Sequence, residues 1–268
     1  MAEFGFVHLT DPHLRPAGER LYGLDPGERL RAAAADMARR HGPGSAAPAA
    51  FAVITGDLAH DGYEGAYALL REAVGALPFP VHLLLGNHDD RDAFRAAFPE
   101  APVDAAGFVQ QAVATPAGRF VMLDTHEPGQ AGGVLCAARL GWLAERLAEG
   151  EEPVFLFLHH PPYRSGMPGM DRSMLAASEG LWAVLAPHRA RLRHLFHGHT
   201  HRPIAGSWHG VPVSSLRGSS HQVALEFRDT GRVPGSQEPA AYAYVRVTPE
   251  AVVVHAHDFL DPTATFDL

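Results

Sequence analysis

The sequence contains a single cysteine, Cys136, among its 268 residues. One cysteine excludes an intrachain disulfide, and it also excludes a metal site built from several thiolates. Long apolar runs are missing as well, since the densest run, VFLFL at residues 154–158, is far too short to cross a bilayer. The N-terminal stretch lacks the charged start and the apolar segment of a signal peptide. We therefore expect a cytoplasmic protein with no membrane partner.

Positive charge is also scarce, with 22 Lys and Arg residues against 30 Asp and Glu residues and a net charge of −8. A negative balance without a basic tail argues against a nucleic-acid partner, because neutralising a phosphate backbone requires clustered cations. With 46% apolar residues over this length, the chain can bury the core of one large domain. No repeat or low-complexity linker divides residues 1–268, so we predict a single domain.

Short apolar runs alternate with helical patterns over the first two hundred residues. The runs are typical of strands buried on both faces, and they lie at residues 4–10, 51–55, 81–86, 119–124, 154–160 and 194–198. Apolar residues recur with helical spacing at 30–37, 63–74, 140–147 and 181–185. Asp61, with Glu64 three residues later, matches a capping box, so we expect Asp61 to cap the second helix. This alternation predicts an α/β fold.

From about residue 205 the pattern changes to strands separated by turns. The candidate strands are residues 211–216, 221–227, 241–248 and 251–259, and they favour an antiparallel set. Residues 229–239 are rich in Gly and Pro and predict a loop.

Residues of types that can bind metal ions follow five of the predicted strands. In chain order they are Asp11 and His13, then Asp57, then Asn87, His88 and Asp89, then His159 and His160, and last His197, His199 and His201. In open α/β sheets, sites are built in the crevice at the carboxyl ends of the strands. We therefore expect these side chains to meet at one edge of the molecule.

Seven of these residues form a candidate ligand shell of nitrogen and oxygen without sulfur. They are Asp11, His13, Asp57, Asn87, His159, His199 and His201. Seven ligands are too many for one ion, but they suit two ions that share a carboxylate, and Asp57 is the natural bridge. Imidazole combined with carboxylate favours Mn, Fe, Co or Zn over Ca. Two such ions can stabilise both the attacking and the leaving oxygen of a phosphoryl displacement.

The motifs D-x-H, GD, GNHD, HH and GHTH, in this order over residues 11–201, resemble those of the calcineurin-like metallophosphoesterase superfamily. The resemblance implies a four-layer α-β-β-α sandwich with a strand-rich C-terminal part. It also implies how the ligands divide between two metals, with Asp11, His13 and His201 on the first, Asn87, His159 and His199 on the second, and Asp57 on both.

The same resemblance implies a catalytic role for His88, which would face the phosphate and assist the leaving group. His197 has no counterpart among the ligands of the family. We interpret His160 as an orienting or core residue rather than a ligand, and His8 as a core histidine.

A narrower resemblance points to class III cyclic nucleotide phosphodiesterases and bacterial glycerophosphodiesterases. It rests on RPAGERLYG at 15–23, GNHDDRDAF at 86–94, HHPP at 159–162 and GSSHQV at 218–223. It implies a small phosphodiester as substrate, and it places Tyr22 and His221 outside the ligands but near the metals. It also implies that residues 205–268 form a cap or pair subunits in a dimer or larger homo-oligomer.

The segment 162–174, beside the HH motif, is rich in Gly, Pro and Met and predicts a substrate-facing loop. Arg164 and Arg172 within it are candidates for phosphate or ribose contacts.

Metal-assisted hydrolysis of a phosphodiester is the mechanism that these residues favour. A hydroxide held by one or both metals, with Asp57 between them, would attack phosphorus in line with the leaving alkoxide. His88, if protonated, would hydrogen-bond the phosphate or the leaving oxygen and donate a proton as the P–O bond breaks. A phosphomonoesterase with the same metals is the alternative enzyme. A metal-binding scaffold without catalysis is the alternative from another class.

Overall fold

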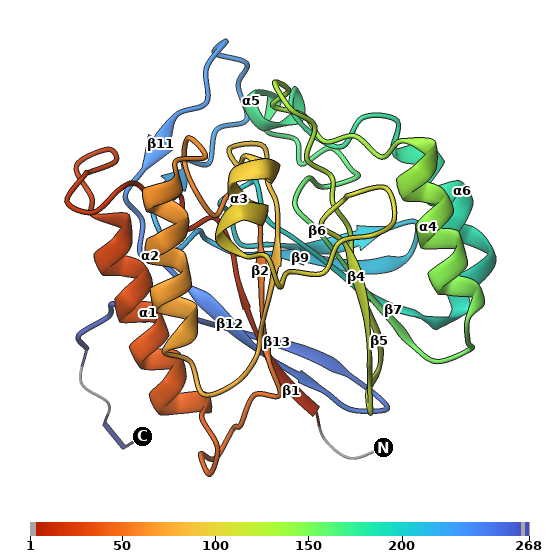
Figure 1. Ribbon diagram of the computed structural model, residues 1–268, viewed down its shortest axis with the longest axis horizontal. Coiled ribbons are helices and arrows are strands. Elements are labelled where there is room, and N and C mark those ends of the chain that lie inside the picture. The colour runs from red at the N-terminus through yellow and green to blue at the C-terminus, as the bar shows by residue number, and fades with distance from the viewer. Residues whose placement is uncertain (1–3, 264–265, 268) are drawn as a thin grey trace.

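Two β-sheets pack face to face with helices on both outer sides, as the computed structural model shows for residues 4–263 and 266–267 (Figure 1). The first sheet has the order β13-β12-β1-β2-β3 and the second has the order β4-β5-β6-β7-β9-β8. The strands of the first sheet are β1 (Phe4–Leu9), β2 (Ala52–Thr55), β3 (Val81–Leu84), β12 (Tyr242–Val247) and β13 (Val252–His257). Those of the second are β4 (Gln111–Thr115), β5 (Gly118–Met122), β6 (Val154–Leu158), β7 (Leu192–His197), β8 (Ile204–Trp208) and β9 (Val211–Ser215).

Helices cover the outer face of each sheet, so the predicted four-layer α-β-β-α sandwich is confirmed. The first sheet is covered by α1 (Pro26–His41), α2 (Glu64–Gly75) and α3 (Arg91–Ala97). The second is covered by α4 (Ala137–Ala148) and α6 (Ser178–Leu185), and the chain continues from α6 into a short 3-10 helix, Ala186–Arg191. Among the described residues, no helix combines the length and the apolar character needed to cross a membrane.

The space between the two sheets is filled mainly by aromatic rings. Phe6 on β1 is fully buried, and its ring lies 5.3 to 5.8 Å from the rings of Phe51, Phe120, Phe157 and Phe196, measured between centroids. Aromatic rings at these separations stabilise a core beyond the free energy that comes from burying their area. The strand ends above this core are therefore held in fixed relative positions.

The parallel strands run as the sequence pattern predicts. β1, β2 and β3 are parallel in the first sheet, and β5, β6, β7 and β9 are parallel in the second. The C-terminal strands are distributed over both sheets, because β8 and β9 extend the second sheet while the antiparallel pair β12–β13 extends the first. Residues 1–3, 264–265 and 268 of the predicted single domain lie outside the described part of the chain.

Two local predictions are wrong. Asp61 does not cap α2, because that helix begins at Glu64 with Tyr63 at the N-cap, and the Asp61 carboxylate is engaged by Arg15. The run 221–227 is not a full strand, since only Gln222–Val223 forms β10, which pairs with β11 (Gly235–Ser236) inside the predicted loop 229–239. This small pair stands beside the short α5 (Pro168–Asp171) at the top of Figure 1.

Replacing Phe6 with alanine should lower the free energy of unfolding by about 3–5 kcal/mol, because it opens a cavity in the aromatic core. Phe227→Ala is the matched control, since Phe227 is 63% exposed. Urea denaturation followed by circular dichroism would measure both variants. Equal losses in the two variants would show that the inter-sheet core does not carry the stability assigned to it here.

Candidate dinuclear metal centre

Five of the candidate ligands have a left-handed backbone conformation just beyond the strand ends. Asp11, His13, Asp57, His199 and His201 all have positive φ, between 45° and 66°. A left-handed conformation outside glycine costs about 1–3 kcal/mol per residue and is concentrated at functional sites. The chain thus leaves its extended path immediately after β1, β2 and β7, which turns these side chains inward.

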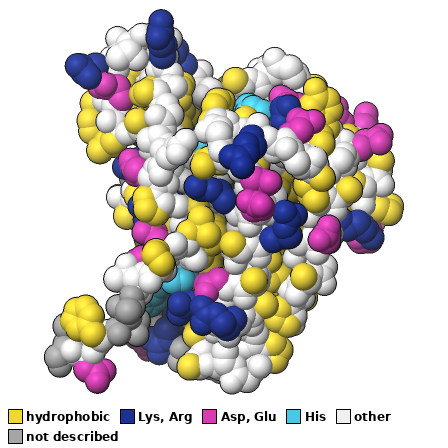
Figure 2. All heavy atoms as spheres, turned by 90° about the vertical axis from the view of Figure 1, so that its left-hand side faces the viewer, with side chains coloured by type: hydrophobic (Ala, Val, Ile, Leu, Met, Phe, Trp, Pro, Cys, Tyr) yellow, Lys and Arg dark blue, Asp and Glu magenta, His cyan; other side chains and the backbone are white. Residues whose placement is uncertain are grey.

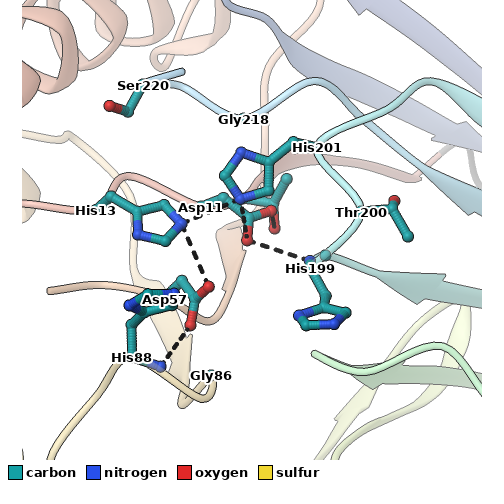
Figure 3. A network of polar contacts seen from close by, with 12 residues as sticks. Asp11, His13, Asp57, Gly86, His88, His199, Thr200, His201, Gly218 and Ser220 are labelled. Atoms are coloured by element: carbon teal, nitrogen blue, oxygen red, sulfur yellow. Dashed lines mark hydrogen bonds and ion pairs between the residues drawn. The ribbon is translucent and has the colours of Figure 1, made fainter. Parts of the chain in front are cut away.

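The first cluster consists of Asp11, His13, Asp57 and His201, whose side chains point toward one another (Figure 3). The Nε2 atom of His13 lies 3.3 Å from Asp57 Oδ2 and 3.0 Å from His201 Nε2, and the latter lies 3.3 Å from Asp11 Oδ1. A tetrahedron with bonds of about 2.1 Å has edges of about 3.4 Å, which matches these separations. The four atoms could therefore hold one ion of the size of zinc.

A second cluster lies on the other side of the Asp57 carboxylate. Asp57 Oδ1 is 3.4 Å from His159 Nε2, which is 3.3 Å from the amide oxygen of Asn87. A ligand atom of His199 lies within 4.8 Å of one on His159. Because Oδ2 of Asp57 faces the first cluster and Oδ1 faces the second, this carboxylate could bridge two ions.

Backbone carbonyls fix which nitrogen of two imidazoles faces these clusters. The Nδ1–H of His159 donates to the Thr55 carbonyl at 2.7 Å, and the Nδ1–H of His201 donates to the His221 carbonyl at 2.8 Å. Each ring therefore turns its Nε2 toward its cluster, and this is the nitrogen that would bind a metal once it has lost its proton.

A chain of buried hydroxyls orients the Asp11 carboxylate. An ionised carboxylate only accepts, so the Thr10 hydroxyl must donate to Asp11 Oδ2, at 2.7 Å. Thr10 then accepts from the Thr55 hydroxyl at 2.8 Å, and Thr55 accepts from His8 Nε2–H at 2.9 Å. The chain occupies Oδ2 and leaves Oδ1 of Asp11 for the first cluster. With the proton of His8 on Nε2, its Nδ1 is a buried acceptor without a partner among the described residues.

The two carboxylates are almost completely removed from water, and imidazoles balance their charge. Burial acts to raise the pKa of Asp11 and of Asp57, but His201 and His159 respectively outweigh burial, so both pKa values are lowered. Burial acts to lower the pKa of His159, but Asp57 and then Asp11 raise it to about 9. Without metal, protonated imidazole therefore supplies the cationic charge that the carboxylates require. Two divalent ions bound in the clusters would supply more of this positive charge.

Asp89 ties together the two loops that carry Asp57 and Asn87. Its carboxylate accepts from the backbone N–H groups of Leu58, Ala59 and Gly86, at 2.8 to 3.1 Å. Burial, and after it the charge of Asp57, raises the pKa of Asp89 to about 7. These bonds hold the GD and GNHD loops at a fixed separation.

Gly86 permits the close approach of those loops. A Cβ at this position would lie 2.7 Å from His159 Cε1 and would overlap the Asp57 carboxylate. Any residue other than glycine would therefore displace the candidate bridge.

The clusters form one side of a cavity of about 550 Å³. The same cavity is also lined by Tyr22, by Met170 of α5, by Val223 of β10, and by Val233 and Gln237. The cavity thus combines the polar clusters with apolar side chains that fit an organic group.

The structure brings all seven candidate ligands, and His88, to this region. Tyr22 and His221 also line the cavity, and the ring of His221 lies 4.8 Å from that of His13 and 4.7 Å from that of His201. Arg164 and Arg172 are not among the lining residues, and Arg172 instead pairs with Asp229 at 3.0 Å.

The three alternating histidines at 197, 199 and 201 have different surroundings in the structure. His197 ends β7 and bonds the Tyr163 hydroxyl through Nε2 at 2.6 Å, away from the clusters, whereas His199 and His201 follow in the next loop. His160 is buried, and its Nδ1 lies 2.8 Å from the Thr125 hydroxyl.

Several cavity residues carry no signal in the sequence. Ser173 bonds His199 Nε2 at 3.0 Å, His60 bonds His13, and Gln237 donates to the Tyr22 carbonyl at 3.0 Å. The one signal that could have indicated Ser173 is its place in the segment 162–174, which does border the cavity through Met170 and Ser173.

The chain belongs to the calcineurin-like phosphoesterase family, whose pattern it matches over residues 4–203. Membership implies a dinuclear metal site, and the donor set described above fits one.

Three relatives are similar over most of the chain. A probable cyclic nucleotide phosphodiesterase from Rhodopseudomonas palustris is 44% identical over 98% of this chain and 95% of its own. A cAMP/cGMP dual specificity phosphodiesterase from Mycobacterium tuberculosis is 32% identical over 94% of this chain and 78% of its own. A glycerophosphodiester phosphodiesterase from Enterobacter lignolyticus is 29% identical over 84% of this chain and 80% of its own.

A solved structure shares the fold at low sequence identity. A dimetal phosphatase from Danio rerio superimposes with a TM-score of 0.73 at 16% identity, covering 96% of this chain and 97% of the other. This likeness supports the architecture alone.

Thr10→Val should weaken metal binding about 10- to 100-fold, because the variant keeps the shape of threonine but loses the donor to Asp11 Oδ2. Thr10→Ser retains the hydroxyl and should bind metal like the wild type. Titration with a competing chelator would measure both. Equal affinities for the valine and serine variants would remove the orienting role of the hydroxyl chain.

Metal binding should release protons, since His159 is protonated below a pKa of about 9 in the metal-free protein and must be neutral to bind an ion. The apparent affinity should therefore rise as the pH rises from 7 to 9. Calorimetry in two buffers of different ionisation enthalpy would count the protons released. A metal affinity independent of pH over this range would contradict the charge balance described above.

Proposed function

We propose that this protein hydrolyses small phosphodiesters, with cyclic nucleotides as the first candidate substrates, at a dinuclear metal centre. The observation that carries the proposal is the position of Asp57, whose two oxygens face two separate ligand clusters on the floor of one cavity. The relatives named as cyclic nucleotide and glycerophosphodiester phosphodiesterases support the diester class.

The proposed ligands of the first ion are Asp11, His13, Asp57 and His201, and those of the second are Asp57, Asn87, His159 and His199. Bound there, two ions lower the pKa of a water molecule and neutralise charge on the phosphate oxygens. The mixture of imidazole, carboxylate and amide suits Mn, Fe, Co or Zn. We also propose a cytoplasmic location, to which a chain with a single cysteine is suited.

His88 is the proposed proton donor to the leaving oxygen. Its Nδ1–H donates to the His60 carbonyl at 2.8 Å, which directs Nε2 away from the backbone, and the residue lines the cavity. Its backbone N–H donates to Asp57 Oδ1 at 3.0 Å, so the ring is fixed relative to the proposed bridge. A protonated His88 placed in this way can donate to the alkoxide as the P–O bond breaks.

The charge of the cavity favours a diester over a monoester. Among the described residues that line it there is no arginine, and the sequence contains no lysine. A phosphomonoester carries up to two negative charges, which the side chains around the metals would have to neutralise, whereas a diester carries one. The alternative reading as a phosphomonoesterase is therefore the weaker one on electrostatic grounds.

The surface charge agrees with a small substrate rather than a nucleic acid. On the face shown in Figure 2, arginine side chains are interspersed with Asp and Glu and form no continuous basic track. A nucleic-acid backbone requires such a track. We further propose that strands of the region 205–268 pair subunits in a homo-oligomer.

The metal-reconstituted protein should hydrolyse bis(p-nitrophenyl) phosphate faster than p-nitrophenyl phosphate, and Asn87→Ala should abolish most of this activity. His255→Ala is the matched control, because His255 is exposed on β13 and does not line the cavity. A faster rate on the monoester would place the protein with the phosphatases. No activity on either ester with two ions bound would favour the scaffold.

His88→Ala should lower kcat about 10²- to 10⁴-fold on a cyclic nucleotide, whose leaving alkoxide needs a proton. The same variant should lose much less on bis(p-nitrophenyl) phosphate, because nitrophenolate leaves without protonation. Steady-state rates on both substrates at saturating metal would test this. An equal loss on the two substrates would show that His88 does not act as the general acid.

A further inference from the structure

His60 contacts both a proposed metal ligand and the proposed general acid. It follows β2 in the GD loop, is partly exposed, and lines the cavity. Its Nδ1 lies 3.1 Å from the Nδ1 of His13, and its ring stacks on that of His88 with centroids 4.7 Å apart and planes at 16°. Among the described residues, only His60 combines a hydrogen bond to His13 with ring stacking on His88.

The bond between His60 and His13 can hold only one proton, and the two possible donors have opposite consequences. If His60 donates, His13 must carry its own proton on Nε2, the atom that lies among Asp11, Asp57 and His201. A protonated Nε2 cannot bind a metal. If His13 donates, its Nε2 is bare and faces the first cluster, while Nδ1 of His60 is the acceptor.

The second arrangement also fixes the other nitrogen of His60. A neutral imidazole has one donor and one acceptor, so an accepting Nδ1 requires a proton on Nε2. Nε2 of His60 has no hydrogen-bond partner among the described residues, and the ring forms part of the cavity wall. The ring therefore offers a neutral N–H donor beside His88.

We propose that His60 is a positioning residue that accepts the Nδ1–H of His13 and presents its own Nε2–H to an anionic oxygen of the substrate. The inference rests on the proposed function in two respects, the binding of a metal by His13 Nε2 and the presence of an anionic substrate in the cavity. His60 would link metal binding to substrate binding, because the tautomer that accepts from His13 is also the one with an N–H for the substrate.

The choice of histidine for this position has an electrostatic consequence. The usual partner of a metal-bound histidine is a carboxylate or a carbonyl, which only accepts. A carboxylate at position 60 would orient His13 equally well, but it would present a negative charge to an anionic phosphate. Histidine supplies the same acceptor to His13 and a donor on the side of the cavity.

The first experiment compares metal affinity in three proteins by chelator competition, a readout that needs no substrate. His60→Phe keeps a stacking ring but has no acceptor, and it should weaken the first metal site about 10- to 100-fold. His60→Asn places Oδ1 where Nδ1 stands and should retain an affinity close to that of the wild type. His255→Phe and His255→Asn are the matched controls, and thermal melting of the metal-free proteins checks that each variant is folded.

The second experiment measures KM and kcat at saturating metal for His60→Asn and His60→Asp. Both variants keep an acceptor for His13, so both should be fully loaded. The aspartate variant should raise KM for a diester about tenfold over the asparagine variant, because only aspartate repels the substrate. Inhibition by inorganic phosphate should weaken in the same order.

Metal affinity equal to that of the wild type in His60→Phe, or equally weakened in the phenylalanine and asparagine variants, would overturn the acceptor role. Equal KM values for His60→Asn and His60→Asp would overturn the role toward substrate. If the wild type bound two metals but hydrolysed no diester, the proposed function would fail, while the affinity comparison would still decide the acceptor role.

Discussion

Two carboxylates buried side by side are the constraint on which the rest of this structure depends. Asp11 and Asp57 are at most 2% exposed, yet their neighbours hold them in the ionised form. Buried negative charge is stable only when cations or hydrogen-bond donors surround it closely. The histidines around the pair, the hydroxyl chain behind Asp11 and the backbone N–H of His88 at Asp57 all help to meet this requirement. Two metal ions bound between the carboxylates would meet it as well.

The side chains that meet this requirement come from both sheets of the sandwich. Asp11, His13, Asp57 and Asn87 follow strands of the first sheet, whereas His159, His199 and His201 follow strands of the second. Each proposed ion would therefore take ligands from both sheets. The aromatic core beneath holds the sheets at a fixed separation, and with it the candidate ligand atoms, which lie close enough together to share an ion. Preorganisation of this kind reduces the reorganisation that binding and catalysis require.

The positions of the candidate ligands could be predicted from the sequence because buried parallel strands form recognisable apolar runs. The first carboxylate after such a run appears just beyond its end, as with Asp11 and Asp57. Ser173 and Gln237 in the cavity wall could not be predicted, because they reach the cavity only through the tertiary packing of segments distant in sequence. The prediction that Asp61 caps α2 was wrong because Asp61 pairs with Arg15, which is distant in sequence. Patterns of neighbouring residues do not indicate such a contact. Strand pairs as short as β10–β11 likewise leave no periodic signal.

Anomalous diffraction from the manganese-loaded protein, recorded at the absorption edge of the metal, tests the central claim most directly. The account predicts two peaks about 3.5–4 Å apart, on either side of the Asp57 carboxylate. One peak should lie among Asp11, His13 and His201, and the other should lie near Asn87 and His159. A single peak, or two peaks that do not share Asp57, would contradict the dinuclear centre on which the proposed function rests.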